Sequence, residues 1–358
     1  PHVMLAGCTH APVVELAEKL AALTGGALGH SFFASDGASA VEIALKMSFH
    51  SWRNRGRGDK REFVCLRHGY HGETIGALAV TDVAVFRDAY DPLLMRAHVV
   101  ASPDSRQGDG SQERALEDLQ RVLEARRGRI AALIVEPLVQ CAAGMAMHDP
   151  SYLAAARRLC DAHEVHLIAD EIAVGCGRTG TFFAFEQAGC GWPDFITLSK
   201  GISGGTLPLS VVLATEAVYE SFWSEEVARG FLHSHSYTGN ALACAAANAV
   251  LDRFAANRVL ERNREQARQL AEAFAPLAGD ARIAHLRQRG MILAFDVRDA
   301  PPRFAERFHL AARERELLIR PIGPTVYLMP PYVIDAATAS WLAGAVIATL
   351  HDVLDDAH

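Results

Sequence analysis

The chain has 358 residues and is 50% hydrophobic, which is enough to bury one large α/β core together with a smaller second domain. It carries 42 acidic and 35 basic residues, for a net charge of -7, and no dense block of lysine or arginine, which argues against a nucleic-acid partner. No apolar run reaches 18 residues and no basic-then-apolar leader is evident, so we expect neither a membrane span nor a secretory signal.

The chain contains seven cysteines, an odd number, and none of them forms a CxxC pair. Most lie in apolar or small-residue surroundings, which favours reduced and partly buried thiols. Because reduced thiols are typical of the cytoplasm, we expect a cytoplasmic protein.

A turn at Gly37 is the first candidate ligand site along the chain. Here the apolar run 32–34 gives way to a helical pattern. A glycine turn that leads into a helix leaves backbone N–H groups free at the positive end of the helix dipole, and these groups favour an anion such as a phosphate. An ordinary helix cap without a ligand would read the same way. The turn contains no GxGxxG, which argues against a dinucleotide.

Beyond this turn, apolar strand-like runs alternate with helical patterns. The strand-like runs are 62–66, 98–100, 130–135, 165–168, 195–198 and 210–214, and the helical patterns include 112–125 and 151–163. This alternation predicts an α/β fold with a mostly parallel central sheet and helices on both faces. An alanine-rich helix is expected over 240–254, and we place a domain boundary after it. A large domain would then span 1–255, and a smaller α+β domain would span 256–358.

Polar residues follow several of these strands. Tyr70 follows one strand between two glycines, which permit a close backbone approach and would let its ring lie flat on a bound cofactor. His68 and His71 beside it would equally suit a turn without a ligand. Since neither has Cys or carboxylate partners at ligand spacing, we expect no metal site. Glu136 follows another strand, where it would orient a cofactor or be a plain strand-end charge.

Asp170 and Lys200 each end a short apolar run that is expected to be a buried strand. In a parallel sheet both residues would emerge at the carboxyl edge, where open α/β sheets bind ligands. A lysine amine that faces a carboxylate suits pyridoxal phosphate: the amine forms a Schiff base, and the carboxylate keeps the pyridine nitrogen protonated. By strand alternation, Asp170 faces inward and Glu171 points away.

Three motifs give a family resemblance. Val135-Glu-Pro, Leu167-Ile-Ala-Asp-Glu-Ile-Ala-Val-Gly-Cys-Gly-Arg-Thr-Gly180 and Leu198-Ser-Lys-Gly-Ile-Ser-Gly-Gly205 resemble the class III aminotransferases of pyridoxal fold type I. Supporting runs cover nearly the whole chain in order. Within the class, the chain is most similar to the members that act in biotin synthesis. This resemblance implies transfer of an amino group from S-adenosylmethionine, or lysine, to 8-amino-7-oxononanoate, by ping-pong kinetics, to give 7,8-diaminononanoate.

The resemblance also implies roles for the residues around the cofactor, pyridoxal 5'-phosphate. Lys200 would form the Schiff base and shuttle a proton, and Asp170 would hold the pyridinium nitrogen. Gly37 and Ala38 would donate backbone N–H groups to the phosphate. Tyr70 would stack near the ring and contact the substrate.

The remaining roles implied by the resemblance concern the second ring face, the partner subunit and the substrate. Ile172 would cover the other face of the ring. His235 and Ser236 match the stretch that reaches across a homodimer to the partner's phosphate, so the two active sites would be shared. Ser234 falls at a substrate contact. Arg320 matches the arginine that grips the carboxylate of the keto acid, a task suited to a bidentate guanidinium.

The chain departs from the family pattern in three respects. Ala38 stands where a serine hydroxyl is common, and Ser234-His-Ser236 replaces a more usual Gly-Pro-Thr. The family's N-terminal segment of several dozen residues, which carries aromatic residues that line the substrate site, is absent from this sequence. These departures leave the substrate pocket and the choice of donor open.

Three other interpretations of the sequence are weighed against this function. Another class III aminotransferase, acting on an ω-amine or an ornithine-like donor, would share the fold and Lys200. A catalytically silent protein that serves as a binding module is disfavoured by the intact Lys200 and Asp170. A nicotinamide dehydrogenase is disfavoured by the missing dinucleotide fingerprint.

Overall fold

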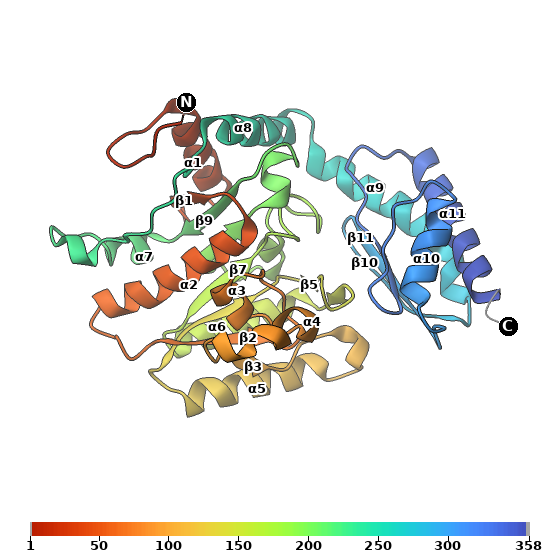
Figure 1. Cartoon of the computed structure of the whole chain (residues 1–358), viewed down its shortest axis with the longest axis horizontal. Coiled ribbons are helices and arrows are strands. Elements are labelled where there is room, and N and C mark those ends of the chain that lie inside the picture. Colours follow the sequence, from red (N-terminus) through yellow and green to blue (C-terminus); the bar gives the residue numbers. More distant parts are fainter. Residues whose placement is uncertain (1, 356–358) are drawn as a thin grey trace.

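A seven-stranded sheet lies at the centre of the computed structural model, which describes residues 2–355 (Figure 1). Its strand order is β1-β9-β8-β7-β4-β2-β3, and only β9 runs against the others. The strands are β1 (His30–Ala34), β2 (Glu62–Leu66), β3 (His98–Val100), β4 (Ile130–Val135), β7 (His166–Asp170), β8 (Phe195–Leu198) and β9 (Ser210–Ala214). The prediction of a mostly parallel sheet is confirmed, whereas the reversed direction of β9 was not anticipated.

Helices cover both faces of this sheet. They are α1 (Ala11–Leu23), α2 (Gly37–Asn54), α3 (Ile75–Ala79), α4 (Ala84–Arg87), α5 (Ser111–Ala125), α6 (Pro150–Ala162), α7 (Glu216–Glu220) and α8 (Ala241–Ala256). Shorter 3-10 turns are η1 (Asp88–Leu93), η2 (Ser105–Gln107), η3 (Ala184–Ala188), η4 (Lys200–Ser203) and η5 (Val227–Arg229). A two-stranded hairpin, β5 (Val139–Gln140) and β6 (Ala146–Met147), follows β4.

The burial of strand β4 shows why these strands are continuously apolar. Leu133 and Val135 pack into one core cluster, which includes residues of α1, α5, α6 and α8, whereas Ile134 between them packs into another, which includes residues of α2 and α3. Because successive side chains of a strand point to opposite faces, a strand covered on both faces has to be apolar at every position.

The C-terminal part of the chain forms a smaller lobe, shown in blue in Figure 1. It contains α9 (Val259–Phe274), η6 (Ala275–Gly279), β10 (Ile283–Arg289), β11 (Ile292–Val297), α10 (Phe304–Arg313), β12 (Thr325–Leu328) and α11 (Ala336–Asp355). β10, β11 and β12 form an antiparallel sheet. A separate core cluster draws only on residues from 270 onward. These features support the proposed domain boundary after residue 255, which stays a prediction.

Strand β11 connects the cores of the two lobes. Leu293 and Phe295 pack into the core of the small lobe, while Ile292 and Ala294 pack into a core cluster of the large lobe. One face of the small sheet therefore lies against the large lobe.

Helix α11 is, by length and composition, apolar enough to cross a membrane, although no such span was expected. Its residues Ala343, Val346, Leu350 and Val353 are instead buried in the core of the small lobe. The core helix of a globular domain has the same composition.

Candidate active site

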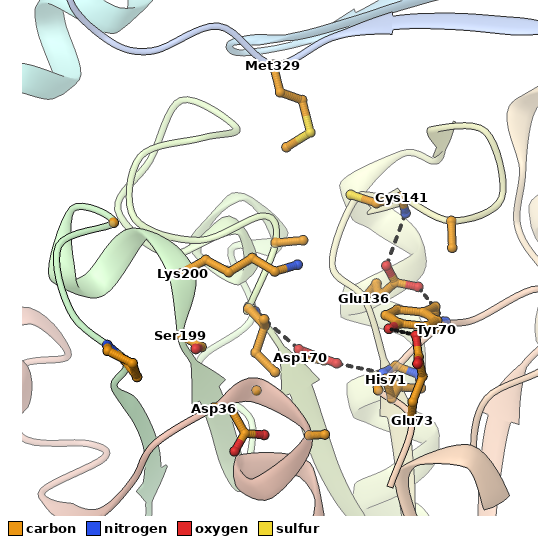
Figure 2. A pocket seen from close by; sticks show the side chains of 18 of the residues that line it. Asp36, Tyr70, His71, Glu73, Glu136, Cys141, Asp170, Ser199, Lys200 and Met329 are labelled. Carbon is orange, nitrogen blue, oxygen red and sulfur yellow. Dashed lines mark hydrogen bonds and ion pairs between the residues drawn. The ribbon is translucent and has the colours of Figure 1, made fainter. Parts of the chain in front are cut away.

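A cavity of about 1030 Å³ opens at the carboxyl ends of β1, β2, β4, β7 and β8, below the small lobe. Figure 2 shows the side chains that project into it. The large lobe contributes polar residues to its lining: Ser35, Asp36, Tyr70, His71, Glu73, Glu136, Asp170, Ser199 and Lys200. The small lobe contributes Arg320, Ile322, Tyr327 and Met329. The strands end there because each gives way to a turn that starts with a polar or small residue.

Asp170 is the last residue of β7, and three groups of the protein contact its carboxylate. Oδ2 lies 2.7 Å from His71 Nδ1, while Oδ1 accepts hydrogen bonds from Thr197 Oγ1 at 3.2 Å and from the backbone N–H of Ile172 at 3.1 Å. The His71 and Asp170 side chains are only 1% and 4% exposed. A carboxylate held in this way keeps a fixed orientation toward the cavity.

The sequence predicts that His71 reaches the carboxyl edge of the sheet, but it assigns this residue no role beside Asp170. Its backbone N–H donates to Thr81 Oγ1, which orients the ring toward Asp170. Because an ionised carboxylate only accepts hydrogen bonds, Nδ1 carries the hydrogen. Nε2 is buried and has no hydrogen-bond partner among residues 2–355. The position of His71 directly after Tyr70, at a strand end on the same edge as Asp170, was the available signal.

Lys200 follows β8 and enters the cavity above Asp170 (Figure 2). Its backbone has a φ of 45°, which is unusual for a residue other than glycine. The next residue, Gly201, is closely packed, because a Cβ there would lie 2.9 Å from the Cβ of Cys176. A rare backbone conformation that the surrounding packing enforces is typical of functional positions.

Glu136 is buried beside the cavity. Its carboxylate accepts hydrogen bonds from the backbone N–H groups of Tyr70 and Cys141, both at 3.0 Å. Burial nevertheless raises its pKa to about 7. The hydroxyl of Tyr70 donates to Glu73 at 2.9 Å, and burial, followed by this bond, raises the pKa of Tyr70 to about 12. Near neutral pH, Glu136 can therefore gain or lose a proton, while Tyr70 stays protonated.

The predicted turn at Gly37 starts α2. Asp36 caps this helix by accepting a hydrogen bond from the backbone N–H of Ser39 at 2.9 Å. Gly37 and Ala38 follow as first-turn residues, whose N–H groups have no acceptor within the helix. A Cβ on Gly37 would lie 3.0 Å from Ile172, and one on Gly72 would lie 2.6 Å from the Cβ of Ala38. The floor of the cavity thus admits only small residues here.

Glu171 points away from the cavity, as expected from strand alternation. Its carboxylate accepts hydrogen bonds from the backbone N–H groups of Ala184 at 2.7 Å and Phe185 at 2.8 Å, at the start of η3. Burial raises its pKa to about 8. Glu171 therefore fixes the start of η3 and does not contribute to the cavity.

The predicted residues 234–236 do not line the cavity of their own chain. His235 Nε2 lies 3.0 Å from the hydroxyl of Ser35, which does line it. Ser234 and Ser236 lie further along the same loop, outside helices and strands. The prediction that this segment serves a partner subunit stays a prediction.

No cluster of three or more His, Cys, Asp or Glu side chains within residues 2–355 is arranged to hold a metal ion. All seven cysteines are free thiols, of which Cys65, Cys160, Cys176 and Cys244 are buried.

Comparison with known proteins gives one family. Residues 1–350 match the family described as aminotransferase class-III. The chain is also 42% identical to the adenosylmethionine-8-amino-7-oxononanoate aminotransferase of Helicobacter pylori, over 99% of this chain and 81% of that protein.

Solved structures that resemble this chain are also named as enzymes that transfer amino groups. The adenosylmethionine-8-amino-7-oxononanoate aminotransferase of Methanocaldococcus jannaschii superposes with a TM-score of 0.91 at 29% identity, covering 98% of this chain and 82% of the other. An amine transaminase from an uncultivated Pseudomonas species, solved in its PLP-bound form, has a TM-score of 0.92 at 29% identity, with 98% and 83% covered. The fold is therefore shared with proteins that are named as aminotransferases.

Proposed function

The chain belongs to the class-III aminotransferases, and we propose that this aminotransferase delivers its amino group to 8-amino-7-oxononanoate in biotin biosynthesis. The proposal rests chiefly on the 42% identity, over 99% of the chain, to a relative named for that acceptor. S-adenosylmethionine, or lysine, would be the donor. The small-molecule substrates and the free thiols suit a cytoplasmic enzyme.

Pyridoxal 5'-phosphate is the cofactor that we propose, since a structural relative is described in its PLP-bound form. The residues of the cavity fit it chemically: a buried carboxylate, Asp170, and a lysine amine, Lys200, lie near the N–H groups that start α2. When bound, the cofactor supplies an electron sink that stabilises negative charge at the carbon that loses its proton.

The two central residues have distinct tasks in this proposal. Asp170 keeps a proton on the pyridine nitrogen, and its negative charge is held in place by His71 and Thr197. Lys200 would hold the cofactor through Nζ, and its amine would serve as the base that takes the proton from the donor carbon and gives a proton to the acceptor.

The surrounding residues would bind and orient the cofactor. Gly37 and Ala38 would donate backbone N–H groups to its phosphate, and Tyr70 and Ile172 would cover its two faces. Glu136, whose pKa is raised to about 7, would hydrogen-bond the ring hydroxyl and share its proton near neutral pH. These assignments use only residues that line the cavity or are buried beside it.

The acceptor would be recognised at the small-lobe end. Tyr327 and Met329 offer an apolar surface there, and Arg320 is an exposed guanidinium on the same wall. A long apolar keto acid with a terminal carboxylate fits this combination, because arginine binds a carboxylate through two parallel hydrogen bonds. Ser234 would complete the substrate contacts.

A homodimer with shared active sites is part of the proposal. His235 and Ser236 would reach the phosphate bound by the partner subunit. Within one chain, His235 Nε2 lies 3.0 Å from the hydroxyl of Ser35, at the edge of that chain's own cavity.

A class-III enzyme that acts on an ω-amine is the alternative, favoured by the similarity to an amine transaminase. The cofactor-loaded protein should be mixed separately with S-adenosylmethionine, lysine, ornithine and a simple ω-amine, while the visible spectrum is followed. We expect one of the first two to bleach the cofactor, and 8-amino-7-oxononanoate to restore it. Bleaching by the ω-amine alone, without recovery on adding this acceptor, would contradict the proposed function.

A further inference from the structure

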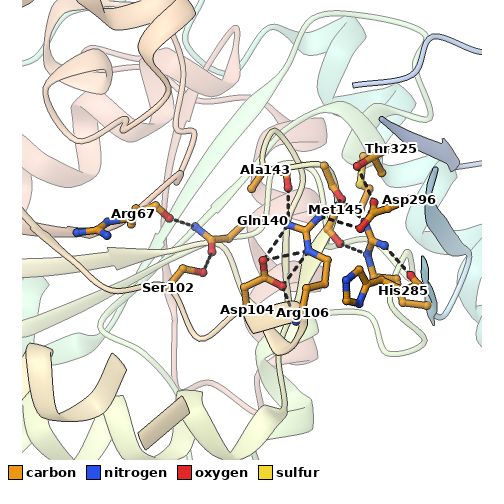
Figure 3. A network of polar contacts seen from close by, with 12 residues as sticks. Arg67, Ser102, Asp104, Arg106, Gln140, Ala143, Met145, His285, Asp296 and Thr325 are labelled. Carbon is orange, nitrogen blue, oxygen red and sulfur yellow. Dashed lines mark hydrogen bonds and ion pairs between the residues drawn. The ribbon is translucent and has the colours of Figure 1, made fainter. Parts of the chain in front are cut away.

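Two arginines from different lobes meet at one carboxylate beside the cavity (Figure 3). Arg287 of β10 places Nη2 3.0 Å from Asp296 Oδ1, and Arg106 of η2 places Nη1 3.6 Å from Asp296 Oδ2. The exposed fractions of the side chains are 9% for Arg287, 19% for Arg106 and 15% for Asp296. Arg106 is also paired with Asp104, whose Oδ2 lies 2.8 Å from Arg106 Nη2, so Asp296 is the carboxylate that faces both guanidiniums rather than the sole partner of Arg106.

Both arginines bind the loop between β5 and β6 by its carbonyl groups. Arg106 donates to the carbonyl oxygens of Ala143 at 2.8 Å and Gly144 at 3.4 Å. Arg287 donates to those of Gly144 at 2.5 Å and Met145 at 3.0 Å. Three successive carbonyls are thus held by one arginine from each lobe.

The β5–β6 loop forms one wall of the cavity. Its residues Cys141, Ala142 and Met145 line the cavity. Met145 has a φ of 53° and Gly144 a φ of 67°, so two consecutive residues adopt the left-handed conformation. For Met145 this conformation is strained, and it persists only where the surroundings enforce it. The bond from Arg287 to the Met145 carbonyl is such a constraint.

The Asp296 carboxylate also contacts β12, which leads into the small-lobe wall of the cavity. Thr325, the first residue of β12, donates from Oγ1 to Asp296 Oδ1 at 2.7 Å. Tyr327 and Met329, two and four residues further on, line the small-lobe side of the cavity. Space at this junction is tight, since a Cβ on Gly144 would lie 2.7 Å from Thr325 Oγ1.

We propose that Asp296 is a positioning residue for the acceptor-binding half of the cavity: through Arg106, Arg287 and Thr325 it fixes the separation of the β5–β6 loop from β12. This inference rests on the proposed function, and it concerns residues that do not line the cavity themselves. Lys200 and Asp170 stand on other elements, η4 and β7. Loss of the contact should therefore weaken acceptor binding more than it slows the reaction of bound substrate.

The test compares Asp296→Asn with a matched control, Asp280→Asn. Asp280 pairs with Arg282 at 2.8 Å and is 18% exposed, but it lies outside the cavity lining. In the cofactor-loaded enzyme, we expect Asp296→Asn to raise the KM for the acceptor about tenfold and to change kcat less than about threefold, since substrate placement depends on such distant supports. Asp280→Asn should leave both constants unchanged.

Two further variants separate positioning from stability. Gly144→Ala keeps every charge but pushes the loop from Thr325, so it should also raise the acceptor KM. Arg106→Met removes the bonds to the Ala143 and Gly144 carbonyls while Asp296 keeps its pair with Arg287, so it should raise the acceptor KM as well. Hydrogen exchange of residues 141–145 should rise in Asp296→Asn but not in the control, whatever the activity.

Each outcome decides one point. A lower melting temperature with an unchanged acceptor KM in Asp296→Asn would overturn the positioning role and leave a purely structural ion pair. Equal rises in KM for Asp296→Asn and Asp280→Asn would overturn it as well. If the wild-type enzyme does not aminate the acceptor at all, the proposed function fails, and the inference fails with it.

Discussion

His71 Nδ1 lies 2.7 Å from Asp170 Oδ2, and both side chains are buried. The imidazole thus gives the carboxylate a fixed hydrogen-bond donor where water cannot supply one. Because a buried polar group without partners is costly, the His71 imidazole helps to hold the Asp170 carboxylate in its orientation. The pair joins a loop after β2 to the end of β7.

Replacement of His71 by alanine should lower kcat by about 10-fold to 100-fold, because the carboxylate loses a charge-assisted hydrogen bond that orients it. The pH titration of the absorbance of the bound cofactor should shift at the same time. His71→Asn, whose amide can occupy the place of Nδ1, should recover part of the rate. His68→Ala, an exposed histidine of the same loop, is the control. An unchanged spectrum in His71→Ala would contradict a role through Asp170.

Replacement of Lys200 by alanine should abolish both turnover and the visible absorbance of lysine-bound cofactor. Lys60→Met is the matched control, because it removes another lysine that lies outside the cavity lining. Lys60 is fully buried, lies 4.2 Å from the centroid of the Trp52 ring and donates to the Ile130 carbonyl at 3.2 Å. Its loss should cost about 2 kcal/mol of stability while the absorbance is kept. Normal turnover in Lys200→Ala would refute the assignment.

Replacement of Arg320 by alanine should raise the KM for the acceptor by about 100-fold and change kcat much less, since the guanidinium binds a carboxylate far from the reacting carbon. Steady-state kinetics with varied acceptor would measure this. Arg315→Ala is the control: Arg315 pairs with Asp352 and lies outside the cavity lining. An acceptor shortened to lack the carboxylate should bind wild type and Arg320→Ala equally well, and a remaining difference would argue against the contact.

Glu171 should make the stability of the protein depend on pH. Its pKa is raised from 4.5 to about 8 by burial, so between these values the folded state binds the proton more tightly than the unfolded state. Below pH 4.5 Glu171 makes its full contribution to the unfolding free energy, and this contribution is lost as the pH rises through about 8. The loss would be on the order of 5 kcal/mol.

Denaturant unfolding would test the role of Glu171. It should be measured at about pH 5.0, 6.5 and 8.5, which cover the range between the two pKa values of Glu171. In Glu171→Gln the decline in unfolding free energy should be shallower, because the amide cannot ionise. Glu113→Gln, an exposed glutamate of α5, should keep the wild-type slope. Parallel curves for wild type and Glu171→Gln would mean that another group, such as Glu136, causes the decline.

Much of the site follows from strand ends that the sequence reveals. Four site residues lie at the end of an apolar run or within four residues of it, and parallel strands bring such residues to one edge: Asp170, Glu136, Tyr70 and Lys200. His71 lies at that edge too, but its hydrogen bond to Asp170 spans 99 residues and leaves no local pattern.

Other features depend on packing between distant parts of the chain that no local pattern encodes. The reversed strand β9 and the left-handed Met145 follow from contacts with distant neighbours rather than from their own residue types. Asp296 looks like an ordinary strand residue in the sequence. Only when the lobes pack together does it come between Arg106 and Arg287.

The sequence by itself determined the α/β class, the parallel strands and the lysine and carboxylate at their ends, because hydrophobic period and chain order are local properties. The tertiary structure alone decided which groups hold those residues: His71 and Thr197 on Asp170, two backbone N–H groups on Glu136, and Asp296 between the lobes. Hydrogen bonds depend on distances between atoms far apart in the chain, and only the folded packing sets those distances.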